Sequence, residues 1–352
     1  MTALCRHFGR CGGCAFQDLS NTDYRIRKRA LVLEALSRQG LDGEVSDIVE
    51  VPPATRRRCV FKIKRGAVGV AVGFHARGSH TIVDMHECRV LTPSLVALVP
   101  RLREIMLRIL NAGEACEAHA TDADSGIDLM LRWRKRIFPS LTASLASWAG
   151  RSGIARIAAG SDILVELEKP AVGIAGARVY LPPGAFLQPT HEGELFLQKK
   201  VLESVGSAKS AVDLFAGCGT FALALASTAK VHAVDSEASQ LEALARTVSN
   251  TRGLKPVTTE KRDLFKHPLA AAELERYDAA VLDPPRAGAA AQIAALAGCR
   301  TGRIAYVSCN PESFARDAVI LNNAGWRMDP IVPVDQFLWS EHIELVTGFR
   351  RG

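Results

Sequence analysis

The sequence predicts an α/β protein in two parts: a β-rich first half, then a doubly wound, mainly parallel sheet with helices on both faces. Residues 45–82 and 127–181 contain short, alternating apolar stretches bounded by turn residues, which are typical of strands. Beyond residue 191, helical and strand patterns alternate along the chain, and this order favours a parallel sheet. The Pro/Gly-rich segment LPPGAFLQP, which begins at Leu181, separates the two parts. We therefore expect domains at residues 1–180 and 181–352.

The elements follow in order along the chain. Residues 22–40 form a basic amphipathic pattern that ends at Gly40, as a helix does. Strands follow, and then a helix over residues 93–112. The second half is predicted from seven stretches, namely EGELFLQKKVLESV (helix), SAVDLFAGCGTFALALAS (strand, Gly turn, helix), KVHAVDSEASQLEALARTVSN (strand, helix), YDAAVLDPPRAG and GRIAYVSCNP (strands), and the closing strands WRMDPIVPV and HIELVTGFR.

Composition narrows the class of protein. The 352 residues are 48% hydrophobic and 23% charged, as in globular proteins. No apolar run reaches the about 18 residues that a membrane-spanning helix needs. The first residues lack the apolar core of a signal peptide, so we expect a cytoplasmic protein. The net charge of +7 permits a polyanionic partner without requiring one. Nine cysteines in such a chain are expected as ligands, catalytic groups or core residues rather than disulfides.

Three predicted strand ends carry groups suited to a nucleotide-type cofactor. In VDLFAGCG, Gly217 and Gly219 allow a tight turn and close approach to a ligand, although the third glycine of G-x-G-x-x-G is absent. Asp235 ends the next strand, where a carboxylate can bind both hydroxyls of an adenosine ribose. Asp283 opens Asp-Pro-Pro at the end of a third strand. Because ligands bind beyond the carboxyl ends of such strands, these residues predict a cofactor site; a dinucleotide enzyme, or an Asp that caps each helix, is the alternative.

This set resembles the class I S-adenosylmethionine-dependent methyltransferases. Asp-Pro-Pro is typical of members that act on bases in nucleic acid. Members that methylate amino groups have an aromatic residue after Pro-Pro, where this chain has Arg286. The resemblance therefore favours a chemistry other than attack by an exocyclic nitrogen.

Cys309, at the end of the predicted strand RIAYVSCNP, is a candidate nucleophile beside that site. The alternative is a buried structural cysteine, the commonest role of a free thiol. C5 of a pyrimidine is a poor nucleophile, but addition of a thiolate to C6 produces an enolate whose C5 can attack a sulfonium methyl group. The C5 proton must then leave, so the reaction needs a cysteine and a base together.

Glu344, in SEHIELV, is the candidate base. The spacing of His342 and Glu344 places both side chains on one face of a strand. Glu344 lies between apolar residues, and a carboxyl group in such a position has a raised pKa that suits a base. The alternative is an edge-strand charge that faces water.

Six ordered motifs then resemble one family: GAFLQP, VDLFAGCGTF, VHAVD, VLDPPRAG, YVSCNP and VDQFLWSEHIELV. The C-terminal half is similar to the RNA 5-methyluridine methyltransferases, which modify uracil C5 in tRNA and in large-subunit ribosomal RNA. The resemblance implies that Cys309 is the nucleophile and Glu344 the general base. It also implies that S-adenosylmethionine is bound by Gln188, Phe215, Asp235 and Asp283. Two positions depart from the family: Thr220 replaces a frequent Asn, and Phe-Leu-Trp-Ser precedes Glu341, which makes Trp339 a candidate for altered substrate contacts.

Four cysteines form a candidate metal site. Cys5, Cys11 and Cys14 have the spacing C-x5-C-x2-C, and Cys88 follows later. Four thiolates hold either zinc or an iron–sulfur cluster, and the spacing does not choose between them. The same pattern in the ribosomal-RNA branch of the family binds a [4Fe–4S] cluster, so the resemblance implies one here. Methyl transfer needs no electron, so we expect the cluster to fold the N-terminal loop and to shape an RNA-binding surface. Four further cysteines are expected to be structural: Cys59, Cys116, Cys218 and Cys299.

Basic residues predict the RNA contacts. RRRCVFKIKRG (56–66) alternates so that Lys62 and Lys64 lie on one strand face and Phe61 and Ile63 on the other, with Phe61 expected in the core. Two further basic clusters are Arg25, Arg27, Lys28 and Arg29, and Arg132, Arg134, Lys135 and Arg136.

The expected function is uracil-C5 methylation in 23S ribosomal RNA by a cytoplasmic monomer. The target uracil is expected to be flipped out of a loop. Relatives often carry an additional small N-terminal β-barrel, which we expect this chain to lack. The alternatives are a tRNA uracil methyltransferase, a cytosine-C5 methyltransferase and a catalytically silent RNA-binding protein.

Overall fold

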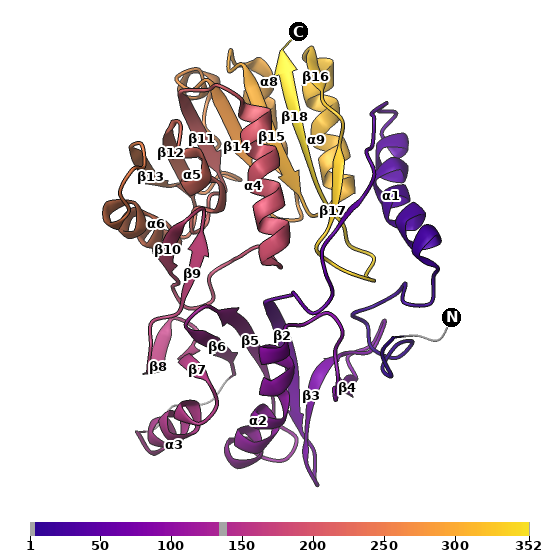
Figure 1. Ribbon diagram of the computed structural model, residues 1–352, viewed down its shortest axis with the longest axis vertical. Helices are drawn as coiled ribbons and strands as arrows, with labels where there is room; N and C mark the ends of the chain where they lie inside the picture. Colours follow the sequence, from indigo (N-terminus) through magenta and orange to yellow (C-terminus); the bar gives the residue numbers. More distant parts are fainter. Residues whose placement is uncertain (1–3, 134–138, 352) are drawn as a thin grey trace.

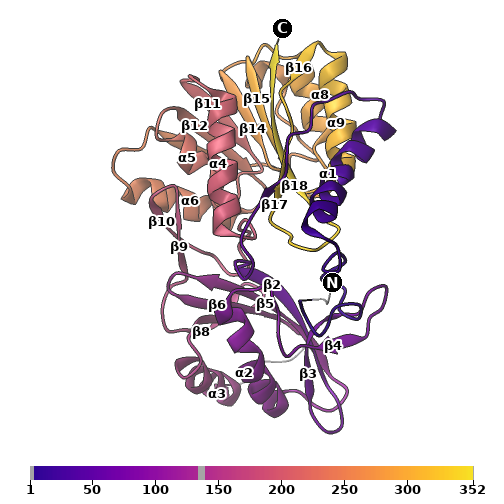
Figure 2. The same cartoon turned by 45° about the vertical axis from the view of Figure 1, so that its right-hand side comes forward.

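The computed structural model describes residues 4–133 and 139–351, which form an upper and a lower body, each built on one large sheet (Figures 1 and 2). The cysteine-rich N-terminal segment lies beside the junction of the two bodies. Over these residues, none of the helices combines the length and the apolar character that crossing a bilayer would require.

The upper body contains the predicted doubly wound sheet, which confirms the fold class. Five strands are parallel, in the order β13 (Val257–Lys261), β12 (Lys230–Asp235), β11 (Ser210–Leu214), β14 (Ala279–Leu282) and β15 (Arg303–Ser308). The sheet continues with the antiparallel β18 (Glu344–Arg351), then β17 (Val332–Asp335) and β1 (Val49–Glu50), while β16 (Trp326–Met328) also pairs with β18.

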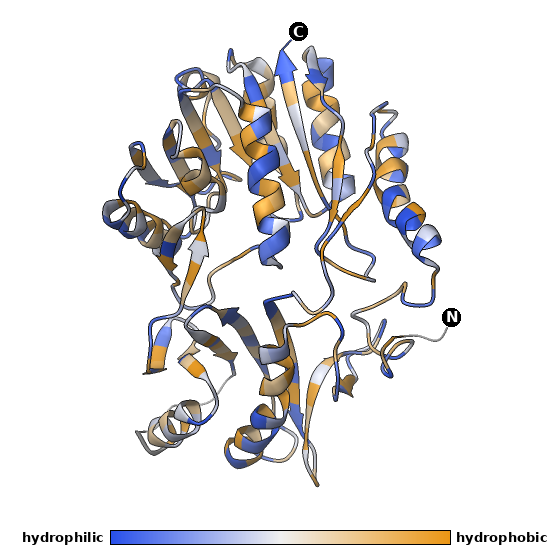
Figure 3. Cartoon of the chain, viewed as in Figure 1, coloured by the Kyte–Doolittle hydropathy of each residue, from blue (hydrophilic) through white to orange (hydrophobic). Residues whose placement is uncertain are grey.

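Helices cover both faces of this sheet. Alternate residues of the central strands, such as Ala211 and Val212, point into two different cores, so central strands such as β14 are largely apolar, as the colours of Figure 3 indicate. One core is packed by α4 (His191–Val205), α5 (Thr220–Leu225) and α6 (Ala238–Asn250). The other is packed by α1 (Asn21–Arg38), α7 (Ala271–Leu274), α8 (Ala290–Gly298) and α9 (Pro311–Asn323).

The N-terminal helix α1 and strand β1 pack on the upper body, whereas the predicted domain boundary between residues 180 and 181 places them in the first domain. Val32 and Leu36 of α1 are buried in the core that contains α9, and β1 pairs in parallel with β17. The apolar stripe of α1 needs a partner surface, and the outer edge of the upper sheet provides one.

The lower body has a seven-stranded sheet with one covered face. Its order is β4 (Ile82–Asp84), β3 (Val70–His75), β2 (Arg58–Arg65), β5 (Ala115–Ala123), β6 (Gly126–Arg132), β7 (Ile154–Ala159) and β8 (Asp162–Glu166); all neighbours are antiparallel except β6 and β7. α2 (Pro93–Ile109) and α3 (Pro139–Gly150) pack on the same core. A hairpin of β9 (Ala171–Ile174) and β10 (Ala177–Tyr180) follows.

Two expectations for the lower body have clear outcomes. The alternation in β2 is confirmed: Phe61 and Ile63 are fully buried in the core, while Lys64 is exposed on the other face. The expectation that residues 127–181 are mostly strands missed α3. Leu145, Trp148 and Ala149 of α3 are buried at helical spacing, but the small residues between them weaken that pattern in the sequence.

Candidate active site

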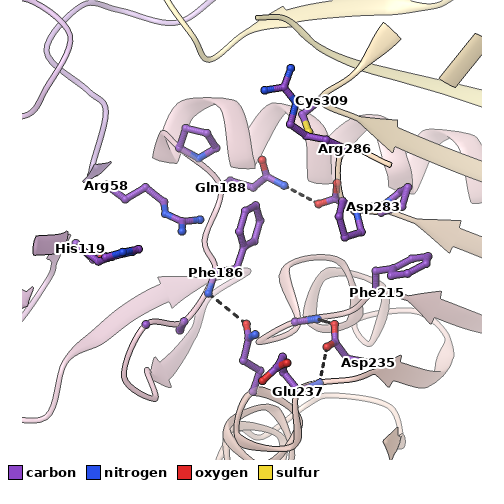
Figure 4. Close-up of a pocket in the computed structure, with 18 of the residues that line it drawn as sticks. Arg58, His119, Phe186, Gln188, Phe215, Asp235, Glu237, Asp283, Arg286 and Cys309 are labelled. Carbon is purple, nitrogen blue, oxygen red and sulfur yellow. Dashed lines mark hydrogen bonds between the residues drawn. The ribbon is translucent and has the colours of Figure 1, made fainter. Parts of the chain in front are cut away.

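A cavity of about 570 Å³ opens where the carboxyl ends of the upper strands face the lower sheet. Residues at the ends of β11, β12, β14 and β15 line it from above, and β2, β5 and β6 line it from below. All six residues predicted for catalysis and cofactor binding line this one cavity: Gln188, Phe215, Asp235, Asp283, Cys309 and Glu344. Figure 4 shows Cys309 near Asp283 on one side of the cavity, with Asp235 on the opposite side.

The turn after β11 is held by Asp235. Its carboxylate accepts hydrogen bonds from Gly217 N (2.9 Å) and Glu237 N (2.8 Å). Gly219 has φ +96°, and a Cβ there would lie 2.5 Å from Cδ1 of Leu244, so this turn requires glycine. Phe215 also has a left-handed φ of +65°, a conformation that is uncommon outside glycine and often found at functional sites.

A fifth strand end, that of β13, contributes residues that the sequence reasoning did not identify. Arg262, Asp263 and Phe265 follow β13 and line the same cavity. The Phe265 ring is half exposed and lies 5.5 Å from the ring of Phe215. The strand VTTEK that ends before this segment is the signal that could have revealed it.

A chain of hydrogen bonds orients the polar side of the cavity. Gln188 donates from Nε2 to Oδ2 of Asp283 (2.7 Å) and accepts at Oε1 from Nε2 of Gln336 (2.9 Å). Thr190 Oγ1 in turn lies 3.3 Å from Oε1 of Gln336. Gln188 is only 1% exposed, so both amide groups are fixed. Gln336 was not predicted, because nothing in VDQFLW marks a glutamine as facing a site.

Cys309 lies among acidic groups. Burial, reinforced by the negative charges of Glu344 and Asp283, raises the pKa of the Cys309 thiol to about 12, while the charge of Arg286 acts in the opposite direction. Burial raises the pKa of Asp283 to about 7 against the stabilising hydrogen bond from Gln188. Burial and the charge of Asp283 together raise the pKa of Glu344 well above its usual range. The resting cavity therefore favours neutral forms, and a proton must leave before Cys309 can attack.

Glu344 is the first residue of β18 and is 2% exposed, so the alternative of a carboxylate that faces water is wrong. The expectation that His342 shares its strand face is also wrong. β18 begins after His342, which is exposed in the preceding loop, with Nδ1 3.5 Å from a guanidinium nitrogen of Arg286.

Two arginines line the cavity: Arg58, the first residue of β2, and Arg56, which lies just before this strand. The guanidinium of Arg58 lies 4.5 Å from the centre of the Phe186 ring, and that of Arg56 lies 5.5 Å from the Phe337 ring. Arg57 instead points away into a buried ion pair with Glu194 (2.7 Å), which joins the two bodies. The RRR motif therefore contributes two side chains to the cavity and one to the domain junction.

Within the second predicted basic cluster, Arg27 is the residue that is exposed, and it pairs with Glu34 of the same helix. Lys28 is buried against Asp335, Arg25 pairs with Glu50, and Arg29 donates to the Val45 carbonyl. The sequence could not show that these charges have internal partners, because those partners lie in other elements. Of the third cluster, Arg132 is exposed, whereas Arg134, Lys135 and Arg136 lie outside the described residues.

Four half-buried thiols line a second cavity of about 390 Å³: those of Cys5, Cys11, Cys14 and Cys88. Backbone N–H groups of His7 and Gly13 donate to the sulfurs of Cys5 (3.4 Å) and Cys11 (3.5 Å). Burial, reinforced by the other three thiols, raises the pKa of Cys14 to about 12.

The described residues (4–133 and 139–351) nevertheless contain no group of three or more His, Cys, Asp or Glu side chains arranged to hold a metal ion. The cysteines expected to be structural are all buried: Cys59, Cys116, Cys218 and Cys299. The cavity of the four thiols and the larger cavity share Arg56, Cys59 and Val60 in their linings.

The sheet order and the cavity define a methyltransferase fold, and the comparisons with known proteins specify it. RNA methyltransferases of Rhizobium meliloti and Brucella suis are 43% and 41% identical to this chain, over 99% of it and 85% and 84% of their own lengths. The 23S rRNA (uracil(1939)-C(5))-methyltransferase RlmD of Cronobacter sakazakii is 30% identical over 99% of this chain and 82% of its own length. The chain therefore belongs to the same family as these RNA methyltransferases.

The family model for tRNA (Uracil-5-)-methyltransferase matches residues 149–349, and the chain belongs to this RNA uracil-5 methyltransferase family. The solved tRNA (uracil-54, C5)-methyltransferase of Pyrococcus abyssi, in complex with S-adenosyl-L-homocysteine, shares the fold: its TM-score is 0.75 at 24% identity, over 96% of this chain and 84% of that one. The resemblance drawn from the six motifs is confirmed at the level of the family.

Proposed function

We propose that this protein transfers a methyl group from S-adenosylmethionine to C5 of a uracil in 23S ribosomal RNA and so forms 5-methyluridine. The observation that supports it most is the meeting of a thiol and two buried carboxyl groups, Cys309, Glu344 and Asp283, in one cavity with Asp235. A nucleophile, a base and a ribose-binding carboxylate are the groups that this reaction needs.

The residues present fit the methyl donor. Asp235, fixed by the Gly217 turn, presents a carboxylate for ribose hydroxyls, and Phe215 and Phe265 offer apolar rings beside it. Gln188 and Asp283 complete the set that we assign to the donor. When bound, S-adenosylmethionine supplies an electrophilic methyl group on a sulfonium. The cavity lies within the range of about 300–1,000 Å³ that ligand sites occupy.

The chain's own groups then act in sequence. The Cys309 thiol and the Glu344 carboxyl group first release their protons to water. The Cys309 thiolate then forms a bond to C6 of the uracil, which places negative charge at C5 and O4. C5 attacks the methyl group, and the electron pair of the broken sulfur–methyl bond leaves with the donor. Glu344 removes the remaining proton from C5, the C5–C6 double bond re-forms, and the sulfur leaves C6 as a thiolate. Arg286, whose charge opposes the rise of the Cys309 pKa, favours the attacking thiolate.

The substrate assignment rests on two observations. A relative named for methylation of 23S rRNA matches nearly the whole chain, and the chain has the four-cysteine pattern. The name of the matching family model and the Pyrococcus abyssi structure favour tRNA as the second candidate. We assign RNA binding to the lower body, where Arg58, Lys62 and Lys64 alternate along the face of β2 opposite the core, starting at the cavity.

We also propose that Cys5, Cys11, Cys14 and Cys88 hold a [4Fe–4S] cluster. Four thiols line one cavity. Four thiolates can hold either zinc or an iron–sulfur cluster, and the resemblance to the ribosomal-RNA branch favours the cluster. The backbone N–H groups that point at two of the sulfurs suit bound thiolates. The cluster takes no part in the steps above, and its expected roles are folding and RNA binding in a monomeric, cytoplasmic enzyme.

Covalent trapping tests the chemistry. RNA that contains 5-fluorouridine has no C5 proton to lose, so it should form a stable adduct with the wild-type protein in the presence of S-adenosylmethionine. The Cys309→Ala variant should form none. An adduct on Cys309→Ala would refute the assignment of the nucleophile, and the absence of any adduct with the wild type would favour a silent RNA-binding protein.

Nucleoside mass spectrometry tests the substrate. Loss of one 5-methyluridine from 23S rRNA in cells without the gene would support the assignment. Loss from tRNA instead would keep the chemistry and overturn the substrate.

A further inference from the structure

Lys28 of α1 is a buried cation outside the catalytic cavity. Its side chain is 0% exposed, and Nζ lies 2.7 Å from Oδ1 of Asp335 and 3.1 Å from the carbonyl oxygen of Phe337. It also donates to the carbonyl oxygen of His342. An ammonium has three donors, and here each meets one acceptor.

These acceptors lie in or directly before one segment, residues 336–343, which we call the 336–343 loop. Asp335 is the residue that precedes it. The loop connects β17 to β18. Gln336 at its start orients Gln188, Phe337 lines the cavity, and the next residue after the loop is Glu344. Because Lys28 binds both ends of the loop, it fixes where Phe337 and Glu344 lie.

Tyr24, one helical turn before Lys28, holds the middle of the loop. Its hydroxyl donates to Oδ2 of Asp335 and accepts from the backbone N–H of Trp339 (2.8 Å). Trp339 has φ +57°, a conformation that costs energy in a bulky residue. Its carbonyl accepts from Ala15 N (2.6 Å) and Phe16 N (3.0 Å). The N-terminal segment thus keeps Trp339 in an unfavourable conformation.

We propose that Lys28 and Tyr24 are positioning residues for methyl transfer, which hold the 336–343 loop so that Gln336, Phe337 and Glu344 face the substrate. The proposal rests on the proposed function. Neither side chain lines the cavity, so neither touches the reacting atoms. A buried ion pair adds little net stability over apolar side chains of the same size, so stability gives little reason for a charge here. The ion pair does fix a single position of the loop. That position matters for the reaction because the loop contains Phe337 and leads directly into Glu344.

The two contacts also connect the cysteine segment to the reaction site. Ala15 and Phe16 directly follow Cys14, and their N–H groups donate to the carbonyl oxygen of Trp339, the residue whose N–H donates to the Tyr24 hydroxyl. The four-cysteine cavity is lined by Leu338, Ser340 and His342 of the loop. Because Phe337 lines the larger cavity, the loop forms one part of the wall between the two cavities.

The test compares two variants with a matched control. Tyr24→Phe removes one buried hydroxyl. Lys28→Met combined with Asp335→Asn removes the ion pair without leaving an unpaired buried charge. The control is Tyr306→Phe, which removes a second buried tyrosine–aspartate hydrogen bond, from Tyr306 to Asp317 (2.6 Å), away from the loop. S-adenosylmethionine affinity, single-turnover methylation of RNA and hydrogen exchange of the peptide spanning 336–343 are measured on folded protein.

Both loop variants should lower the single-turnover rate, by about tenfold for Tyr24→Phe and about a hundredfold for the double variant, since small misplacements near reacting groups have effects of this order. Donor affinity should change far less than the rate, within about twofold, because Asp235 and Phe215 come from other strands. Of the residues assigned to the donor, Gln188 is the one that contacts the loop, through Gln336. Exchange at the Trp339 amide should accelerate. Tyr306→Phe should change none of these three quantities.

The proposal is overturned if the loop variants methylate at the wild-type rate, or if their rate and donor affinity fall together as in a general loss of structure. A wild-type protein that neither methylates nor traps RNA would instead defeat the proposed function, and the exchange at Trp339 would still report whether Tyr24 and Lys28 hold the loop.

Discussion

Two adjoining cavities in this protein are lined by cysteine, and their neighbours give them different chemistry. In the larger cavity, one thiol, Cys309, lies near Glu344 and Asp283. In the smaller one, Cys14 lies near three other thiols, and backbone N–H groups point at two of these sulfurs. The pKa of each of the two cysteines is raised to about 12.

The pKa of a buried thiol therefore does not separate a nucleophile from a ligand. A carboxyl group beside the sulfur can take up a proton, as catalysis requires. Additional thiols can only share a cation or a cluster. Four predictions test this contrast, from the largest expected effect to the smallest.

Glu344→Gln should have the largest effect, lowering turnover by about 10³-fold, since proton removal by a positioned base contributes about 10²–10⁴-fold. The substitution also removes a charge that raises the pKa of Cys309, so attack on C6 should continue. Covalent RNA should therefore accumulate with ordinary uridine, seen as a shifted band on a denaturing gel. Glu341→Gln, at an exposed residue paired with Arg77, is the control; normal release of RNA by Glu344→Gln would assign the base elsewhere.

Cys14→Ser should act through folding and RNA binding instead. We expect the melting temperature to fall by roughly 3–4 °C, which corresponds to about 2–3 kcal/mol for a chain of 352 residues, because a bound cluster stabilises only the folded state. Iron content should fall and RNA affinity should weaken about tenfold. Cys116→Ser, at a buried cysteine of the lower core, should lose some stability but keep iron and RNA affinity. Intact folding and activity in a cluster-free Cys14→Ser protein would remove any role for the cluster.

The residues that sequence reasoning placed correctly in one cavity lie at strand ends. Asp235, Asp283 and Cys309 each follow an apolar stretch, and a parallel sheet brings such ends to one edge. Glu344 was found through the chemistry that Cys309 requires rather than through a pattern. Periodicity alone misassigned its neighbour His342, because a loop residue and a strand residue look alike over three positions.

The contacts that could not be predicted join distant segments. Tyr24 meets Asp335 across 311 positions of sequence, and a basic helix face gives no sign that its one lysine, Lys28, is buried. The same holds for Gln336, whose role depends on Gln188 in another element. Sequence periodicity reports which face of an element is apolar; it does not report which polar partner the packing provides.

The third prediction concerns the pH dependence of stability. Folding raises the pKa of Asp283 from 3.8 to about 7. Its neutral form therefore stabilises the folded state fully below about pH 4, and this contribution is lost as the pH rises towards 7. Asp283→Asn, which stays neutral, should be more stable than the wild type at pH 8, by roughly 2–4 kcal/mol, and nearly equal at pH 4. Thermal unfolding at both pH values measures this; an advantage that does not grow with pH would contradict the raised pKa.

The smallest expected effect concerns a face of the lower sheet. This face continues from Val60, which with Arg56 and Cys59 lines both cavities. Val60 is followed on the same face of β2 by Lys62, paired with Glu117, and by the exposed Lys64. If RNA crosses this face, Lys64 contacts a phosphate, and Lys64→Ala should weaken binding about two- to fourfold at low salt. The slope of log affinity against log salt should fall by about one, as expected for one lost phosphate contact.

The matched control is Lys199→Ala on α4, whose side chain is 72% exposed on the upper body. It should leave both affinity and salt slope unchanged, although it removes the same net charge. Equal losses in the two variants would mean that RNA responds only to the overall charge of +7. A loss confined to Lys64 would instead trace the RNA from the Cys309 cavity along β2, with the four-cysteine segment at its flank.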